Sequence, residues 1–185
     1  MKYLIAKFIF FITGWTLDAS KEKIAAARNT VMIAAPHTSN YDLLFALGAF
    51  WLMRLPIRFF IKDVYTRWYF LGVFKWLGGI GVDRSNRNNL VDYATEIMSK
   101  HTEITLLVPA EGTRRSVERW KTGFYHIAVK AQKDISLGYL DYGKKRAGIL
   151  EVIPVGDQRE TFDIIQDYYR DVEARHPEHY NKIIH

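Results

Sequence analysis

The sequence predicts a single α/β domain, in which a mostly parallel or mixed sheet is flanked by helices, with an apolar interfacial helix at the N-terminus. Short apolar runs alternate with amphipathic segments along the chain, and strands that alternate with helices favour a parallel sheet. The chain has 185 residues, of which 49% are hydrophobic and 25% charged, and this is enough for one domain with a substantial core. No repeat, low-complexity tract or linker divides it.

Residues 1–20 are expected to form a membrane-interfacial helix, and residues 21–185 the folded domain. The apolar side chains between Leu4 and Trp15 fall mostly on one helical face. The apolar run ends near Leu17, and a helix of that length reaches only about two-thirds of a roughly 30 Å hydrocarbon core. We therefore expect it to lie in the interface and not to cross. The alternatives are simple packing on the core and a signal peptide, which the interrupting lysines disfavour.

The remaining elements are assigned from periodicity and from their boundary residues. Strands are expected at residues 31–35, 58–61, 80–82, 105–108, 135–140 and 149–155. Helices are expected at residues 40–53, 66–77, 88–100, 123–133 and 162–175. Ser39 or Asn40 is available to cap the first of these helices, and a polar turn at residues 142–145 joins the last two strands.

Composition limits the chemistry and the partners. The chain contains no cysteine, which excludes disulfides, thiolate metal sites and a cysteine nucleophile. Its formal net charge is +6, and a basic surface favours either nucleic acid or an anionic membrane. Between Arg54 and Lys75 basic residues are interleaved with aromatic ones, a mixture that both kinds of partner site use. Because no nucleic-acid-binding module is recognisable, a membrane surface is expected and nucleic acid is not.

A histidine and an aspartate stand five positions apart where the strand at residues 31–35 gives way to a helix. In such sheets ligands bind beyond the carboxyl ends of strands, so His37 lies where an active site is expected. A carboxylate that fixes the imidazole tautomer lets the other ring nitrogen take a proton from an alcohol near neutral pH. Asp42 is placed to supply that carboxylate. The alternative is a capping histidine and a first-turn aspartate without chemistry.

A second polar segment, Glu111-Gly112-Thr113-Arg114, follows the strand expected at residues 105–108. Glycine lets backbone amides approach a ligand, and the arginine fork matches phosphate oxygens. Glu111 is expected to orient the arginine or to bind a substrate hydroxyl. Arg84, just after the strand at residues 80–82, is expected to join the same anion site. Ordinary polar surface turns are the alternative for both segments.

These segments together resemble the lysophospholipid acyltransferases, the family that includes 1-acylglycerol-3-phosphate acyltransferase. The family's first block, His-x-x-x-x-Asp, matches His37 to Asp42. Its second block, Gly-x-Ile-x-x-x-Arg, matches Gly78 to Arg84, and its third, Glu-Gly-Thr-Arg, matches Glu111 to Arg114. Lys62 stands where the family often has a lysine after a strand, and Lys121 begins a segment similar to its lysine-glycine segment. The resemblance covers about residues 31–133.

The resemblance implies an acyltransferase that moves an acyl chain from acyl-CoA or acyl carrier protein to a hydroxyl of a lysophospholipid-type acceptor in membrane lipid biosynthesis. His37 would be the general base and Asp42 its partner. The residues that would bind the acceptor are Lys62, Arg84, Glu111, Gly112, Thr113, Arg114 and Lys121. The family needs no metal or other cofactor, and its N-terminal helices lie on the membrane. We therefore expect a peripheral protein at the cytoplasmic face of the membrane, with the lipid acceptor and the acyl donor as partners.

Two departures from the family pattern leave the acceptor open. Ala110 precedes Glu111 where the family usually has proline, and the strand expected at residues 135–140 lacks the proline of the family's fourth block. One alternative is a non-phosphorylated lipid acceptor, such as the lysolipid of an amino-acid lipid. The others are a lipid hydrolase that uses water as the acceptor, and a non-catalytic membrane or nucleic-acid-binding protein.

Overall fold

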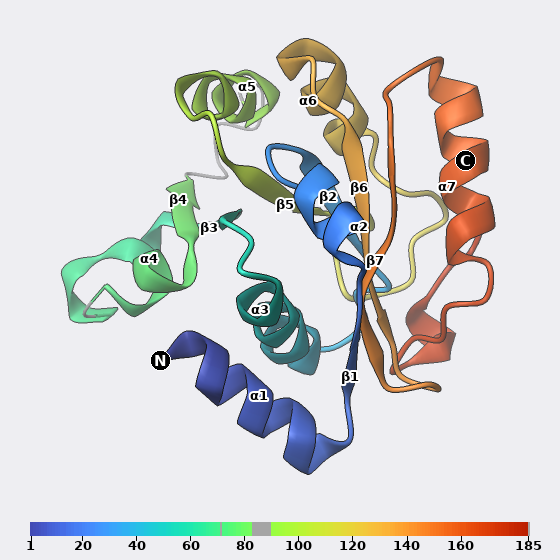
Figure 1. The fold of residues 1–185 in the computed structure, drawn as a ribbon. Helices are drawn as coiled ribbons and strands as arrows, with labels where there is room; N and C mark the ends of the chain where they lie inside the picture. The colour runs from blue at the N-terminus through green and yellow to red at the C-terminus, as the bar shows by residue number, and fades with distance from the viewer. Residues whose placement is uncertain (71, 83–89, 185) are drawn as a thin grey trace.

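In the computed structural model, which describes residues 1–70, 72–82 and 90–184, seven strands form one mixed sheet in the order β1-β7-β6-β2-β5-β3-β4 (Figure 1). The strands are β1 (Thr16–Asp18), β2 (Val31–Ala35), β3 (Ile57–Lys62), β4 (Gly79–Val82), β5 (Thr105–Pro109), β6 (Ile135–Asp141) and β7 (Arg146–Ile153). Neighbours from β6 to β4 run parallel, whereas β7 is antiparallel to β6 and parallel to β1. The expected α/β fold with a mixed sheet is confirmed.

Helices cover both faces of this sheet. The α-helices are α1 (Lys2–Thr13), α2 (Lys21–Ala26), α3 (Tyr41–Met53), α4 (Val73–Leu77), α5 (Leu90–Lys100), α6 (Gly123–Ala131) and α7 (Gln158–Tyr169). Short 3-10 helices lie at Asp63–Thr66, Trp68–Phe70 and Pro177–His179. Helices α5, α6 and α7 share one hydrophobic core with the sheet, and α1 and α3 share the other, on the opposite side (Figure 1).

The central strand β2 shows why the sheet can be covered on both sides. Val31 and Ile33 belong to the core beneath α5, α6 and α7, whereas Met32 between them belongs to the core beneath α1 and α3. Successive side chains of a strand point to opposite faces, so a strand that is apolar throughout is buried on both. The chain leaves the carboxyl end of β2 at Ala35, and the loop that follows carries His37.

The six strands expected from the sequence are all present, as β2 to β7, with bounds that differ by a few residues. Strand β7 begins at Arg146, three residues earlier than expected, because it pairs with β6 directly after the turn at residues 142–145. That turn was predicted correctly. Strand β1 and helix α2 were not predicted, because each is short and mostly exposed and therefore carries no apolar periodicity.

The helices differ more from expectation. The helix expected at residues 66–77 is wrong in extent: only α4 is α-helical, preceded by 3-10 turns. Gly72 has φ +71°, in the left-handed region, and interrupts the helical path at this point. Helix α7 begins at residue 158, where the Asp157 side chain accepts two backbone N–H groups, and ends at residue 169, short of the expected 175. The first two residues of the helix expected at 88–100 lie outside the described residues.

Helix α1 packs on α3 with one side and leaves the other in solvent. Phe10 is buried against Gly48, where a Cβ atom would come within 2.7 Å of the phenylalanine ring. On the outer side Leu4 is 68% exposed and Phe11 83% exposed. None of the helices in the described part of the chain combines the length and the apolarity that a membrane span requires. The helix expected over residues 1–20 is shorter than predicted, because it ends at Thr13 before Gly14 in the left-handed region, and residues 16–18 join the sheet as β1. The interfacial role of this segment stays a prediction.

Candidate active site

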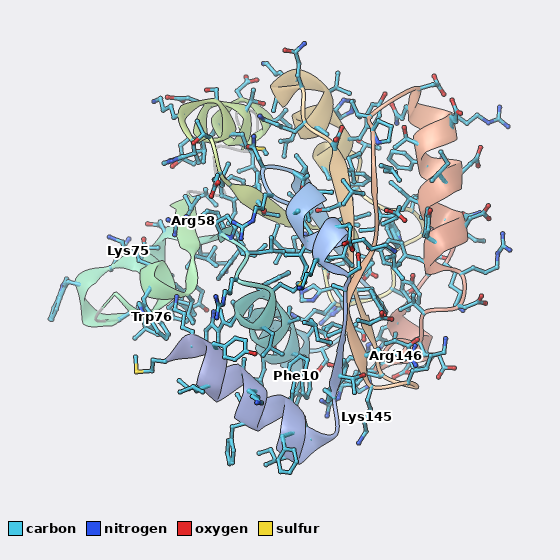
Figure 2. The ribbon with its side chains drawn as sticks, viewed as in Figure 1. Phe10, Arg58, Lys75, Trp76, Lys145 and Arg146 are labelled. Carbon is cyan, nitrogen blue, oxygen red and sulfur yellow. The ribbon has the colours of Figure 1, made fainter. Side chains whose placement is uncertain are left out.

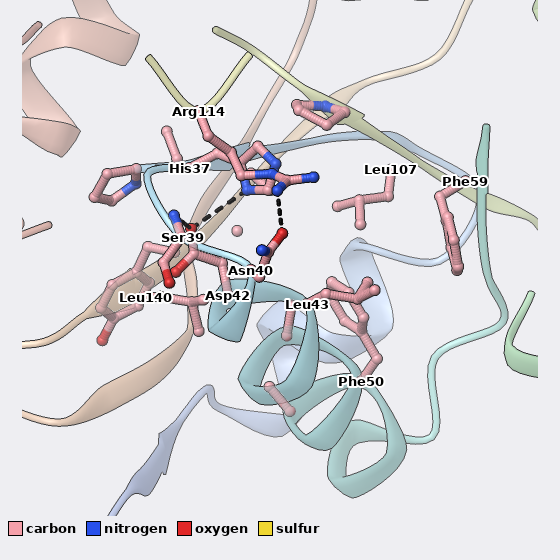
Figure 3. A pocket seen from close by; sticks show the side chains of 18 of the residues that line it. His37, Ser39, Asn40, Asp42, Leu43, Phe50, Phe59, Leu107, Arg114 and Leu140 are labelled. Atoms are coloured by element: carbon pink, nitrogen blue, oxygen red, sulfur yellow. Dashed lines mark hydrogen bonds and ion pairs between the residues drawn. The ribbon is translucent and has the colours of Figure 1, made fainter. Parts of the chain in front are cut away.

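A cavity of about 570 Å³ opens at the carboxyl ends of strands β2, β3 and β5. His37, Lys62 and Arg114, each of which follows or ends one of these strands, contribute to its lining. Apolar side chains from α3 and the sheet line most of the rest, among them Leu43, Phe50, Phe59, Leu107 and Leu140 (Figure 3). The cavity therefore combines a basic, polar rim with an apolar interior.

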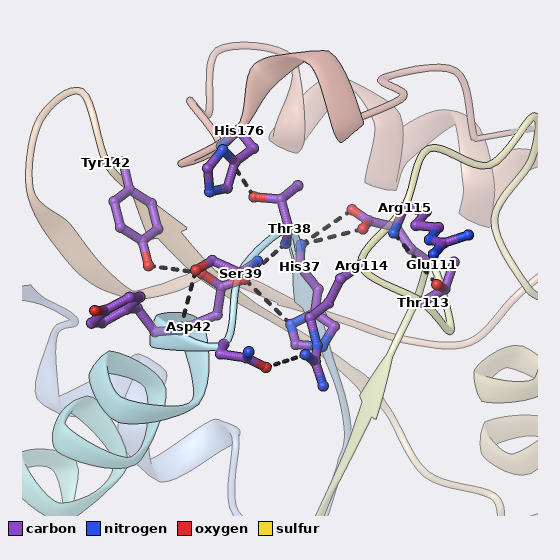
Figure 4. A network of polar contacts seen from close by, with 12 residues as sticks. His37, Thr38, Ser39, Asp42, Glu111, Thr113, Arg114, Arg115, Tyr142 and His176 are labelled. Atoms are coloured by element: carbon purple, nitrogen blue, oxygen red, sulfur yellow. Dashed lines mark hydrogen bonds and ion pairs between the residues drawn. The ribbon is translucent and has the colours of Figure 1, made fainter.

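The polar rim is organised by the carboxylate of Asp42, which is only 3% exposed. Its Oδ2 lies 3.3 Å from Nδ1 of His37 and accepts the backbone N–H groups of Thr38 and Ser39, each at 2.8 Å (Figure 4). Asp42 lies in the first turn of α3, so its carboxylate reaches back over the loop that enters the helix. Of the two residues expected to be available for capping α3, Asn40 makes no side-chain cap hydrogen bond, whereas Oγ of Ser39 accepts the backbone N–H of Tyr41, the first residue of the helix, at 3.2 Å.

The second oxygen of Asp42 is held from another part of the fold. Oδ1 accepts a hydrogen bond of 2.7 Å from the hydroxyl of Tyr142, in the turn between β6 and β7. The Tyr142 ring stands edge-on to Trp15 and Phe45. Burial acts to raise the pKa of Asp42, but the hydrogen bonds from His37, Tyr142 and the Ser39 backbone outweigh it and leave the pKa below its ordinary value. The carboxylate is therefore charged at neutral pH.

This geometry fixes one edge of the His37 ring and leaves the other for chemistry. With Nδ1 directed at Asp42, the neutral tautomer that donates its Nδ1 proton to the carboxylate carries a lone pair on Nε2. The His37 side chain is 25% exposed and lines the cavity. A hydroxyl group bound in the cavity can thus give its proton to Nε2 while Asp42 stabilises the imidazolium that forms.

Glu111 lies behind His37 and not in front of it. The residue is 1% exposed, and both carboxylate oxygens lie 3.3 Å from the backbone nitrogen of His37, whose N–H they accept. Burial raises the pKa of Glu111 to about 7, with the His37 hydrogen bond opposing the shift and the charge of Asp42 adding to it. Within the described residues Glu111 forms no ion pair with Arg114, so it supports the histidine backbone and does not orient the arginine.

The remaining predicted site residues shape the loop after β5. Arg114 reaches across to the loop after β2, where its guanidinium donates to the side-chain oxygen of Asn40 (Figure 4). Gly112 has φ +69°, and a Cβ there would lie 3.1 Å from the Lys121 side chain, which crosses it. The Lys121 backbone N–H donates to Ala110, and Thr113 accepts the backbone N–H of Arg115.

The structure thus brings His37, Asp42, Glu111 and Arg114 together at one rim, with Lys62 on the lining of the same cavity. Gly112, Thr113 and Lys121 lie in the loop that carries Arg114, and none of the three is among the residues that line the cavity. Arg84 lies outside the described residues.

Sequence reasoning missed the contacts made to this rim by the turn after β6 and by residues 173–176. The backbone N–H of Tyr142 donates to the carbonyl of Glu173, and the backbone N–H of His176 donates to Oγ1 of Thr38 at 3.2 Å. The Arg175 guanidinium lies 3.9 Å from the centre of the Tyr41 ring. No local pattern could have found these residues, because they lie about a hundred positions or more from the loop that they hold.

Fold and site together define the class of protein. A parallel-sheet domain with a carboxylate-paired histidine at the strand ends, above an apolar cavity, is an enzyme built for proton transfer to or from a partly apolar substrate. The cations at the same rim add the capacity to bind an anionic group.

Comparison with known proteins gives the family. The Acyltransferase family model matches residues 18–154, most of the chain, so the chain belongs to this family and is an acyltransferase. The crystal structure of the 1-acyl-sn-glycerophosphate (LPA) acyltransferase PlsC from Thermotoga maritima has a similar fold, with a TM-score of 0.64 and 17% sequence identity over 92% of this chain and 77% of that one. The comparison with curated proteins finds no match. The resemblance drawn from the three motif blocks is confirmed.

Proposed function

We propose that this acyltransferase moves an acyl chain from acyl-CoA or acyl carrier protein to a hydroxyl of a lysophospholipid-type acceptor, such as 1-acylglycerol-3-phosphate. The observation that carries the proposal is the His37–Asp42 pair at the rim of a largely apolar cavity that Arg114 and Lys62 also line. The apolar interior suits an acyl chain, and the cations suit a phosphate. The pair suits a hydroxyl that must lose its proton.

In the proposed mechanism Nε2 of His37 takes the acceptor's hydroxyl proton as the oxygen attacks the thioester carbonyl. The carbonyl oxygen becomes an oxyanion, which hydrogen-bond donors of the site stabilise. The intermediate then collapses, the carbon–sulfur bond breaks, and the imidazolium returns its proton to the leaving thiolate. A thioester is already activated, so the reaction needs no covalent enzyme intermediate, metal or other cofactor.

The same proposal assigns roles to the rest of the rim. Arg114 and Lys62, with Arg84, bind the phosphate of the acceptor. Glu111 supports the backbone of His37, and Gly112 shapes the loop that presents Arg114, together with Thr113 and Lys121. The exposed apolar side of α1 rests on the cytoplasmic face of the membrane, which supplies the lipid acceptor and receives the lipid product.

A donor and acceptor matrix tests the proposal. Purified protein is incubated with acyl-CoA or acyl carrier protein and with lysolipids that carry or lack a phosphate, and the products are identified by mass spectrometry. Acylated phospholipid is the expected product. Release of free fatty acid without transfer would identify a hydrolase, and acylation of phosphate-free lysolipids alone would overturn the acceptor assignment.

Arg114→Ala sharpens the acceptor test. Loss of a charge-assisted contact to phosphate costs about 1.5–3 kcal/mol, so the KM for the acceptor should rise roughly ten- to a hundredfold. The KM for the donor should change much less. Arg114→Lys should restore only part of the affinity, because an ammonium lacks the planar fork. A larger effect on acyl-CoA than on the acceptor would mean that Arg114 binds the donor.

A further inference from the structure

A second cavity, of about 680 Å³, lies at the opposite end of the sheet from the catalytic rim. It is lined by Arg58 at the start of β3, by Gly78 just before β4, and by Ile104 just before β5. From Arg58 to Lys62, which lines the catalytic cavity, the strand runs for roughly 13 Å. The two cavities share Phe50 in their linings, but their cationic side chains lie at opposite ends of the strand, so they form separate sites.

Cations and aromatic rings line this second cavity. Lys2 comes from α1, Arg54 from the residue after α3, and Arg58 from β3, and Trp51 and Trp76 stand among them. Lys2 donates a hydrogen bond of 2.7 Å to the carbonyl of Trp76, and its ammonium lies 4.1 Å from the centre of that indole ring. Figure 2 shows Arg58 and Trp76 on the side of the molecule where α1 begins.

These cations are held in place without carboxylate partners. Arg54 lies over the Tyr3 ring, 5.5 Å from its centre. Within the described residues neither Lys2, Arg54 nor Arg58 forms an ion pair, although ten ion pairs occur elsewhere in that part of the chain. Glu103 also lines the cavity, but it already pairs with Arg28 at 3.6 Å. The cluster therefore carries positive charge that the described protein does not neutralise.

The positive groups are close enough to repel one another. Burial lowers the pKa of Lys2, and the charge of Arg58 lowers it further. An anion bound between the two groups would remove this repulsion and would gain charge-assisted hydrogen bonds from the Lys2 ammonium and the Arg58 guanidinium. Phosphate suits this geometry, because its oxygens match the arginine fork.

We propose that this cavity binds the phosphate of a membrane phospholipid headgroup, at a site distinct from the catalytic one. The exposed apolar side of α1 begins next to the cavity, with Leu4 68% and Phe8 63% exposed. A lipid whose phosphate occupied the cavity could lay its chains along that side. Tryptophan and basic side chains are the groups that proteins place at the headgroup level of a bilayer. The assignment of a membrane source rests on the interfacial position of α1 in the proposed function.

Calorimetric titration with dihexanoyl phosphatidylglycerol, kept below its micelle-forming concentration, tests the site without a bilayer. Arg54→Gln/Arg58→Gln should weaken binding at least tenfold, because two charge-assisted contacts are lost. The matched control is Lys145→Gln/Arg146→Gln, which removes the same charge near the far end of α1 (Figure 2). It should change binding by no more than about twofold, because charges beyond a Debye length are screened.

Two further arms separate this site from the catalytic cavity and from free phosphate. Arg114→Gln should bind the short-chain lipid as wild type does, and a loss there would place the lipid in the catalytic cavity. Inorganic phosphate should bind more weakly than the lipid, and equal affinity would assign the site to free phosphate. If both double variants lost the same lipid affinity, binding would depend on the overall positive charge and not on this cavity. That result would overturn the proposal. Acyl transfer in detergent, assayed in parallel, should be retained by Arg54→Gln/Arg58→Gln. The binding measurement does not depend on which acceptor the enzyme uses.

Discussion

The segments that follow β2 and β5, the first of which includes the first turn of α3, meet at the rim of the 570 Å³ cavity, and each buries a carboxylate against the same histidine. Asp42, in the first, accepts hydrogen bonds from the His37 ring, two backbone N–H groups and the hydroxyl of Tyr142. For Glu111, in the second, the donor among the described residues is the backbone N–H of His37. The two carboxylates are similarly buried, at 3% and 1% exposure.

The difference in partners gives the two carboxylates opposite titration behaviour. Burial acts to raise both pKa values, but the donors around Asp42 reverse the shift, whereas the contact at Glu111 leaves its pKa at about 7. Whether a buried carboxylic acid is charged or neutral therefore depends on how many hydrogen-bond donors contact it. Asp42 is kept charged, and Glu111 lies close to its titration midpoint at neutral pH.

The largest effect on acyl transfer is expected when His37, which both carboxylates contact, is replaced. His37→Ala should lower the rate of acyl transfer by about a hundredfold to ten-thousandfold, the usual contribution of a general base. Steady-state kinetics measures the loss, and circular dichroism checks that the fold is kept. Full activity in this variant would refute the proposed mechanism.

Asp42→Asn tests the carboxylate that accepts hydrogen bonds from several donors. The amide cannot accept all the bonds that the carboxylate accepts or stabilise an imidazolium as well, so activity should fall by roughly ten- to a hundredfold, less than for His37→Ala. Because the pKa of Asp42 is lowered on folding, its charge stabilises the wild type above the ordinary pKa, and that stability is lost as the pH falls. Denaturation at pH 3 and pH 7 should show a larger deficit of the variant at the higher pH.

Glu111→Gln tests the carboxylate that accepts the backbone N–H of His37. The pH dependence of its contribution to stability should be opposite to that of Asp42. The pKa of Glu111 is raised from 4.5 to about 7, so the folded state favours the protonated acid. Its contribution is fully present below pH 4.5 and is lost as the pH rises through 7, at most about 3 kcal/mol. Chemical denaturation at pH 5 and pH 8 should show the variant gaining relative to wild type at the higher pH. A difference that does not change with pH would contradict the assigned titration.

The smallest effect is expected when one of the hydrogen bonds to Asp42, the bond from the Tyr142 hydroxyl, is removed. Tyr142→Phe keeps the ring edge-on to Trp15 and Phe45 but removes the hydroxyl that donates to Asp42, at a cost of about 0.5–1.5 kcal/mol, or roughly two- to tenfold in kcat. Tyr125→Phe, which removes an exposed hydroxyl bonded to the carbonyl of Gly156, is the control. The two variants should differ in the pH dependence of kcat, and identical profiles would show that Tyr142 does not tune the site.

The sheet and the pairing of His37 with Asp42 could be predicted from the sequence because both depend on local patterns. An apolar strand such as residues 31–35 can be recognised on its own, and His37 and Asp42 sit on either side of one strand-to-helix junction. The position of Glu111 behind the histidine was not predictable, because it depends on how β2 and β5 align in the sheet. The same holds for Tyr142, which reaches Asp42 only through the pairing of distant strands.

The helical errors have a local physical cause. At residues 66–77 the aromatic spacing is helical, but Gly72 adopts a left-handed conformation that interrupts the helix. Strand β1 was missed because three residues at the sheet edge, with one side in solvent, are too few to show alternation. The sequence shows the basic and aromatic residues between Arg54 and Lys75 as one stretch. Only the three-dimensional structure shows that Phe59 packs in the core while Arg54 and Arg58 line the second cavity.

The contacts of Arg175 and His176 with the loop after β2 have a consequence for how the enzyme is made. A growing chain that has reached residue 154 already contains every motif block and all seven described strands. It still lacks the two residues that hold Thr38 and Tyr41. A chain whose synthesis stops after residue 154 and before residue 175 therefore contains all seven described strands but lacks both of these contacts to the segment that carries His37 and Asp42.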